Sequence, residues 1–303
     1  MLFRSVHLLM LGAFAVSIAL AVGCILCLRL LRERQERRSP LRSRQIGHVP
    51  GQQLVERVAD SQENMLLAVI LMYFAFPVML LAWALQRVPP DRLRIDGTAW
   101  VYLLGALGMF VLGLRSFLKH LKARQKARDG LLAERVTGMQ LNRLVAQGCT
   151  VMHDVPSDTG NIDHVVIAPR GVYAVETKSL RKPRNAGELR NDPGHQVQFD
   201  GARLDFPDFS TSKPIEQAMR HADWLRRHLR ECIGQDVPVI AAVALPGWFV
   251  VQEEEIWRNA PVKVFTPMKE GANFITKDIQ RIGPEHRALI ATAIAQRYPV
   301  VSD

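Results

Sequence analysis

Cysteine is scarce in this sequence, with four in 303 residues. A small secreted domain held together by disulfides carries many more, so a disulfide framework is excluded. Cys24 and Cys27 lie within an apolar run, whereas Cys149 and Cys232 are isolated from other cysteines. Neither group has the further Cys and His ligands that a soft-metal centre would require. The scarcity of cysteine fits a domain that faces the cytoplasm.

Acidic residues are in deficit, but only in the first part of the chain. Residues 1–130 contain 18 basic and 8 acidic side chains, whereas residues 131–303 contain 21 of each. The net charge of +10 therefore comes entirely from the first part, and the high isoelectric point is no evidence that the second part binds nucleic acid. Internal repeats and low-complexity segments are also lacking, which excludes repeat architectures.

Charged residues are absent from long stretches of the first part. Residues 8–28 and 65–85 are uncharged runs of 21 residues each, and only Pro77 interrupts the second. Each run is long enough to cross a hydrocarbon core of about 30 Å as a helix. Residues 100–114 form a shorter run, which spans if the basic residues that follow it extend to the interface. We expect three transmembrane helices, at about 8–28, 65–85 and 100–118, in an anchor covering residues 1–128.

Basic residues are unevenly distributed between the loops of this anchor. Residues 29–64 contain eight Arg and residues 115–130 contain six Lys or Arg, against one Arg before residue 8 and three in 86–99. Because basic loops stay in the cytoplasm, we expect the N-terminus outside and the C-terminal domain in the cytoplasm, at the inner (plasma) membrane of a bacterial cell. The first run is longer than the apolar part of a signal peptide, about 7–15 residues, so an uncleaved anchor is favoured.

A β-hairpin is predicted in the second part of the chain. Residues 160–168 and 172–178 are β-rich and apolar, and the turn signal Pro169-Arg170-Gly171 separates them. The proline suits the second position of a type I turn, and the glycine suits the bulge that commonly follows it.

Three charged side chains collect at the end of this hairpin. With a two-residue loop, Asp163 lies opposite Glu176, and Lys178 shares their face because side chains alternate along a strand. Two carboxylates can hold a hard cation such as Mg²⁺ beside a lysine, which suits phosphodiester cleavage. A cross-strand ion pair is the alternative. Val165 and Val172 place the trio on a face meant for burial, which favours the metal site.

A helix over residues 129–147 supplies a further carboxylate. Glu134 begins a stripe that continues through Gly138, Leu141 and Val145 at helical spacing. The glycine would let the helix approach a sheet closely. An acidic residue in a first helical turn also has an ordinary explanation in the helix dipole.

Together these residues resemble the nuclease-related domain (NERD), a branch of the restriction-endonuclease-like PD-(D/E)xK superfamily, over about residues 128–245. The resemblance implies an α/β fold, in which transmembrane helices precede a restriction-endonuclease-like αβββαβ domain at 129–303. Many relatives carry a helical Gln-x-x-x-Tyr motif, and this chain has Gln217 followed by His221 instead. Four segments carry the resemblance: Gly130-x-x-Ala133-Glu134, Gly160-Asn161-Ile162-Asp163-His164, Gly171-Val172-Tyr173-Ala174-Val175-Glu176-Thr177-Lys178-Ser179 and Pro214-x-x-Gln217-Ala218.

The resemblance also implies a chemistry, the hydrolysis of phosphodiester bonds in nucleic acid, with DNA as the favoured substrate. Asp163 and Glu176, with the Thr177 carbonyl, would hold Mg²⁺ or Mn²⁺. Lys178 would place or activate the water, and Glu134 would assist. Four more residues are candidates for contacting substrate or for supporting the site from behind: Gln217, His164, Arg181 and Lys182.

The remaining sequence completes an α/β domain. Residues 196–206 predict a second hairpin, 237–246 and 262–265 predict strands, and 284–297 predict a terminal helix. A second functional hypothesis stays open, namely an inactive nuclease-like module that binds nucleic acid or a protein partner at the membrane. A helical core stripe is predicted at Ile215, Ala218, Ala222, Leu225 and Leu229.

Overall fold

The structure is a computed structural model that describes residues 52–85, 97–158, 160–182, 195–277 and 281–298. The chain divides into two compact units. One comprises Met1–Gln45 and Arg57–Gln125, and the other comprises Ile46–Glu56 and Lys126–Asp303. The predicted helix at 8–28 lies outside the described residues.

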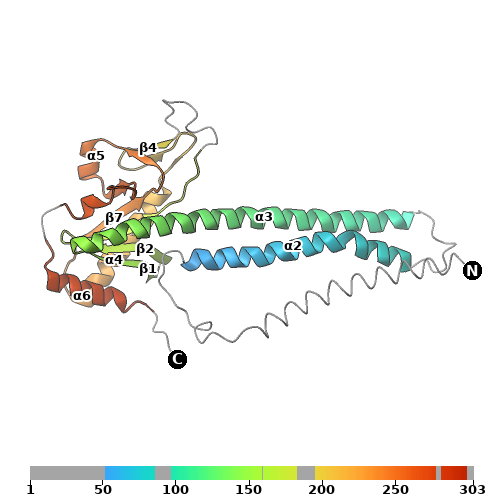
Figure 1. Ribbon diagram of the computed structural model, residues 1–303, viewed down its shortest axis with the longest axis horizontal. Helices are drawn as coiled ribbons and strands as arrows, with labels where there is room; N and C mark the ends of the chain where they lie inside the picture. The colour runs from blue at the N-terminus through green and yellow to red at the C-terminus, as the bar shows by residue number, and fades with distance from the viewer. Residues whose placement is uncertain (1–51, 86–96, 159, 183–194, 278–280, 299–303) are drawn as a thin grey trace, which may run out of the picture. The chain divides into compact units, whose positions relative to one another are not determined.

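In the first unit, helix α2 (Gln52–Leu85) and the first part of α3 (Gly97–Asn142) lie side by side (Figure 1). Small residues allow helices α2 and α3 to approach each other closely. A Cβ added to Gly113 would lie 2.6 Å from Cγ of Met72 and 3.2 Å from the carbonyl oxygen of Ala68. Glycine and alanine at helix contacts are common in membrane proteins.

Both helices expose apolar side chains. Leu66, Tyr73, Leu104 and Leu112 are each more than 60% exposed. By length and composition, two described helices can cross a membrane, Arg57–Leu80 and Trp100–Gln147, with 12% and 11% of their most apolar windows buried. Length and composition alone are weak evidence, because signal sequences and core helices of soluble proteins pass the same test.

The predicted helices at 100–118 and 129–147 form one continuous helix, α3. The expected helix start at residue 129 is therefore wrong. The intervening residues are good helix formers, and one glycine, Gly130, costs only about 1 kcal/mol relative to alanine. At the other end, a 3₁₀ turn (η2, Arg143–Gln147) winds more tightly than an α-helix, so Leu144 is buried and the predicted Val145 is 54% exposed.

The second unit contains a five-stranded sheet in the order β1-β2-β3-β7-β9. The first three strands pair antiparallel, and β3, β7 and β9 pair parallel. In chain order, the end of α3, β1 to β3, helix α4 (Lys213–Ile233) and β7 follow the predicted αβββαβ pattern, with three short strands of a second sheet between β3 and α4. The strands are β1 (Thr150–Ser157), β2 (Gly160–Ile167), β3 (Val172–Thr177), β7 (Val239–Ala244) and β9 (Val262–Phe265).

A second sheet, in the order β6-β5-β4-β8, holds four short strands. The predicted hairpin at 196–206 is confirmed as β4 (Gln196–Phe199) and β5 (Leu204–Asp205). The sequence did not predict β6 (Ser210–Thr211) or β8 (Phe249–Val251), which are only two and three residues long. The helices are α4 (Lys213–Ile233), α5 (Glu254–Asn259), the 3₁₀ turn η4 (Asn273–Ile275) and α6 (Pro284–Ala295).

Each face of the large sheet is buried. One cluster joins the sheet to α4 and α6, and includes all five residues of the predicted α4 stripe. The other joins the sheet to the end of α3 and to η4, through Leu141, Leu144 and Ile275. The charged residues at the strand ends therefore lie between helix layers.

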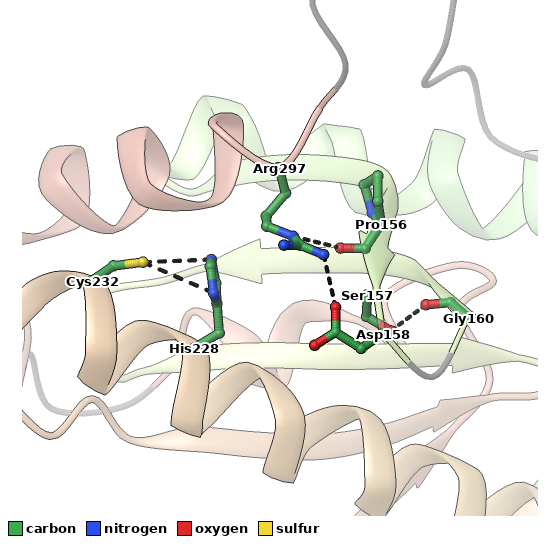
Figure 2. A network of polar contacts seen from close by, with 7 residues as sticks. All are labelled: Pro156, Ser157, Asp158, Gly160, His228, Cys232 and Arg297. Carbon is green, nitrogen blue, oxygen red and sulfur yellow. Dashed lines mark hydrogen bonds and ion pairs between the residues drawn. The ribbon is translucent and has the colours of Figure 1, made fainter.

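A polar network ties the segment after α6 to the β1–β2 connection (Figure 2). Arg297 donates to Asp158 at 3.0 Å and to the carbonyl oxygen of Pro156 at 3.4 Å. On α4, Sγ of Cys232 lies 3.7 Å from Nε2 of His228. None of these residues belongs to the predicted active trio.

The hairpin turn is closed by two hydrogen bonds between Ala168 and Gly171, of 2.9 and 3.2 Å. The predicted bulge at Gly171 is wrong, because this glycine does not have a positive φ. The need for glycine is steric instead. A Cβ there would lie 2.8 Å from the carbonyl oxygen of Pro238, which accepts the N–H of Val172.

Candidate active site

Strands β2 and β3 bring Asp163 beside the end of β3. In the pairing of β2 with β3, His164 lies opposite Val175. Asp163 and Glu176 are the next residues along their strands, so this register agrees with the predicted two-residue loop. The backbone N–H of Thr177 donates to Oδ2 of Asp163 at 2.7 Å. A carboxylate on one strand is thereby fixed to the backbone of the next.

Glu176 is 2% exposed, on the central strand of the five-stranded sheet. Nζ of Lys178 donates to its Oε1 at 2.6 Å. Nδ1 of His221, on α4, lies 3.1 Å from its Oε2. Both carboxylate oxygens of Glu176 therefore face a basic group.

The two carboxylates have opposite electrostatic environments. Burial, and then the negative charges of Glu176 and Glu134, raise the pKa of Asp163 well above its ordinary value, and the Thr177 N–H and Lys178 only partly offset this. Burial also opposes ionisation of Glu176, but the contact with His221 and the charge of Lys178 outweigh it and lower the pKa of Glu176. Two basic side chains therefore contact Glu176, whereas the pKa rise at Asp163 is only partly offset.

Glu134 comes from α3 and is half-buried. The negative charge of Glu134 raises the pKa of Asp163, so helix α3 and the hairpin contribute carboxylates to the same site. Asp163, Glu176, Lys178 and Glu134 are brought together, as the sequence predicts, and their catalytic roles stay predictions.

This arrangement coincides with a family match. Residues 129–246 match the family model described as the nuclease-related domain, NERD. The predicted resemblance to NERD is confirmed. The match covers less than half of the chain and includes every candidate site residue. The search of curated proteins and the search of solved structures returned no match.

The sequence did not predict that His221 contacts Glu176 in the candidate site. It stands where many NERD relatives have the tyrosine of a Gln-x-x-x-Tyr motif, and it is 3% exposed. The sequence did contain a signal, because Gln217 and His221 are four residues apart and lie on one helix face. Gln217 is half-buried, one turn before His221 on α4.

The other candidates contact residues outside the trio of Asp163, Glu176 and Lys178. His164 is completely buried, so it cannot touch a substrate in this conformation, and its Nδ1 lies 2.8 Å from Nδ1 of His153. Arg181 is engaged with Asp129 through two nitrogens at 2.7 and 2.6 Å. Lys182 lies 5.6 Å from the ring centroid of Trp248.

The residues of the site fit a cation by charge. The negative charges of Glu176 and Glu134 both act on Asp163, while Lys178 and His221 contact Glu176, so a divalent cation would add positive charge beside Asp163. Among the described residues, no group of three or more His, Cys, Asp or Glu side chains is arranged to hold a metal ion. A carboxylate has about four lone-pair sites, so Glu176 can keep both contacts and still act as a ligand.

Proposed function

We propose that the chain is a membrane-tethered, metal-dependent nuclease that hydrolyses phosphodiester bonds in nucleic acid, with DNA as the favoured substrate. The observation that carries the proposal is the meeting of two carboxylates and an ammonium at the end of one hairpin. Oδ2 of Asp163 accepts from the backbone N–H of Thr177 at 2.7 Å, and Oε1 of the neighbouring Glu176 accepts from Lys178 at 2.6 Å. Carboxylate oxygens suit a hard cation, and a cation there would counter the burial and the charges of Glu176 and Glu134 that raise the pKa of Asp163.

Each residue of the site has a proposed role. Asp163 and Glu176, with the Thr177 carbonyl, would hold Mg²⁺ or Mn²⁺, which when bound would supply positive charge for the phosphate and lower the pKa of a bound water. Lys178 would orient that water or support the developing negative charge, and Glu134 would bind a second cation or an ordered water.

His221 keeps Glu176 ionised. The contact between its imidazole and Oε2, at 3.1 Å, helps to lower the pKa of Glu176, which favours the charged carboxylate that a hard cation requires. A neutral carboxylic acid would be a poor ligand for a hard cation.

The membrane tether rests on the apolar helices of the first unit. Their exposed leucines and valines are unsuited to water, and a hydrocarbon environment would cover them. The distribution of basic residues between the loops supports a cytoplasmic location for residues 129–303 at the inner membrane. A reporter fused after residue 303 tests this: activity of a cytoplasm-specific reporter is expected, and activity of a periplasm-specific reporter would refute the topology.

A cleavage assay tests the activity. The full chain, purified in detergent, is incubated with end-labelled DNA and RNA in the presence of Mg²⁺, Mn²⁺ or EDTA. We expect cleavage with either metal and none in EDTA. Asp163→Asn should abolish cleavage, and Asp208→Asn, which neutralises an exposed carboxylate in a loop, should retain it.

Lys178→Ala separates chemistry from metal binding. Removal of the ammonium should abolish cleavage while Mg²⁺ still raises the melting temperature of the protein, because a ligand that binds only the folded state stabilises it. Exposed Lys213→Ala is the matched control and should cleave normally.

A binding module without activity is the second candidate. It is favoured by one observation, that both oxygens of Glu176 already contact Lys178 and His221. Nucleic-acid binding that is indifferent to metal, without cleavage, would select this module over the enzyme.

A further inference from the structure

A cavity of about 650 Å³ lies in the second unit, at the starting ends of β3 and β7. Its wall includes Arg170 in the β2–β3 turn, Val239 and Ile240 at the start of β7, and residues of α5 and β9. The candidate active site is at the finishing end of β3, where Glu176 lies. The cavity is therefore a separate feature, within the size range of small-molecule sites, about 300–1,000 Å³.

The cavity is strongly basic. Four basic residues and one acidic residue line it, although residues 131–303 as a whole carry equal numbers of each. The acidic residue, Glu254, is already paired with Arg258. Burial, and then the positive charge of Arg170, lower the pKa of Lys263. An anion in the cavity would relieve this repulsion between Arg170 and Lys263.

Aromatic rings form another part of the wall. Trp257 and Phe274 meet edge to face with centroids 4.8 Å apart, and Phe274 also meets Tyr173 at 5.9 Å. Trp257 and Phe274 are only partly buried, so their rings are not sealed within the core. Partly exposed ring surface beside concentrated positive charge fits a ligand that has both a planar ring and an anionic group.

Lys263 is held in place for such a contact. Its ammonium donates to the carbonyl oxygens of Trp257 and Arg258, at the end of α5. The ammonium also lies 5.4 Å from the ring centroid of Trp257. An ammonium has three N–H donors, so the two carbonyl bonds leave one for the ring or for a ligand. The two backbone bonds fix the lysine and reduce the entropy that it would lose on binding.

We propose that this cavity binds a phosphate group attached to a planar heterocycle, as in a nucleoside monophosphate or the phosphorylated end of a nucleic-acid strand. Arg170 and Lys263 contact the phosphate, and the base packs against the rings of Trp257 and Phe274. This binding does not depend on cleavage at Asp163.

Titration calorimetry on the full chain in detergent tests the proposal with five probes: adenosine monophosphate, adenosine, inorganic phosphate, a 5′-phosphorylated oligonucleotide and the same oligonucleotide without the phosphate. We expect adenosine monophosphate to bind at least about tenfold more tightly than adenosine or phosphate alone. A preference for the phosphorylated oligonucleotide over adenosine monophosphate would assign the site to strand ends instead.

Variants locate the binding. Arg170→Gln should weaken it at least about tenfold, since a charge-assisted contact is lost, and Trp257→Leu should weaken it through loss of ring packing. Exposed Arg227→Gln removes the same charge from α4 and should leave affinity unchanged, and cleavage-deficient Asp163→Asn should bind normally. Circular dichroism checks that Arg170→Gln is folded. The proposal is overturned if millimolar adenosine monophosphate gives no binding heat, or if Arg170→Gln and Arg227→Gln weaken binding equally.

Discussion

Nδ1 of His221 lies 3.1 Å from Oε2 of Glu176, and this contact joins helix α4 to the central strand of the sheet. The two side chains are 4% and 2% exposed. The helix therefore does more than cover the sheet, because it brings an imidazole against a buried carboxylate and helps to lower the pKa of that carboxylate.

Replacing His221 should reverse that effect. In His221→Leu we expect the pKa of Glu176 to rise and the free energy of unfolding to fall by about 1–3 kcal/mol at neutral pH, since a buried carboxylate loses a hydrogen-bond donor. Because the pKa of Glu176 is lower in the folded state than the value of 4.5 in the unfolded chain, ionisation of Glu176 stabilises the fold above pH 4.5. The stability lost in His221→Leu should therefore shrink as the pH falls from 4.5 through the lower folded-state pKa. Urea melts from pH 3 to 8 would measure this, with half-buried His228→Leu on the same helix as control.

Asp163→Asn should raise the free energy of unfolding, whereas His221→Leu should lower it. The folded-state pKa of Asp163 is raised, so the wild-type fold loses stability as the pH rises from the ordinary value of 3.8 through the higher folded-state pKa. We expect the variant to be more stable than the wild type at pH 8, by about 1–2 kcal/mol, with little difference below pH 3.8. Thermal melts in EDTA would show this, and a variant less stable at every pH would mean that Asp163 is part of a structural ion pair.

His164 should make the fold sensitive to mild acid. Burial, and then the charge of His153, lower the pKa of His164 from 6.5 to about 3. The unfolded chain takes up the proton first as the pH falls, so the contribution of this residue to stability is complete above pH 6.5 and is lost toward pH 3. His164→Asn should flatten the dependence of urea midpoint on pH in this window, and exposed His195→Asn should not.

The 3₁₀ ending of α3 can be tested with two adjacent residues. Leu144→Ala should lower the free energy of unfolding by about 2–4 kcal/mol, because Leu144 is 1% exposed in the core. Val145→Ala should change it by less than about 0.5 kcal/mol, because Val145 is on the surface. Equal effects of the two variants would mean that the helix continues as an ordinary α-helix and buries the valine.

The hairpin and the charged trio were predictable because their geometry is local. Alternation along a strand and a two-residue loop are enough to place Asp163 near Glu176. The stripe on α4 was predictable for the same reason, because Ile215 and the residues that follow it repeat at helical spacing.

Features that depend on packing between distant segments were not predictable. The contact between His221 and Glu176 requires the position of α4 against β3, which no spacing encodes. The continuity of α3 was missed because Asp129-Gly130 has the composition of a helix start, although the flanking residues favour helix strongly enough to override it. The basic cavity was missed because Arg170, Trp257 and Phe274 come from three separated segments.

The central position of β3 has a consequence for motion at the site. Glu176 and Thr177 pair with β7 on one side of β3, and Asp163 caps the other side through the N–H of Thr177. Amide groups held in this way exchange with solvent only when most of the domain opens. Any local adjustment at Asp163 and Glu176 must therefore come from side-chain rotation, while the backbone that carries these two carboxylates stays fixed.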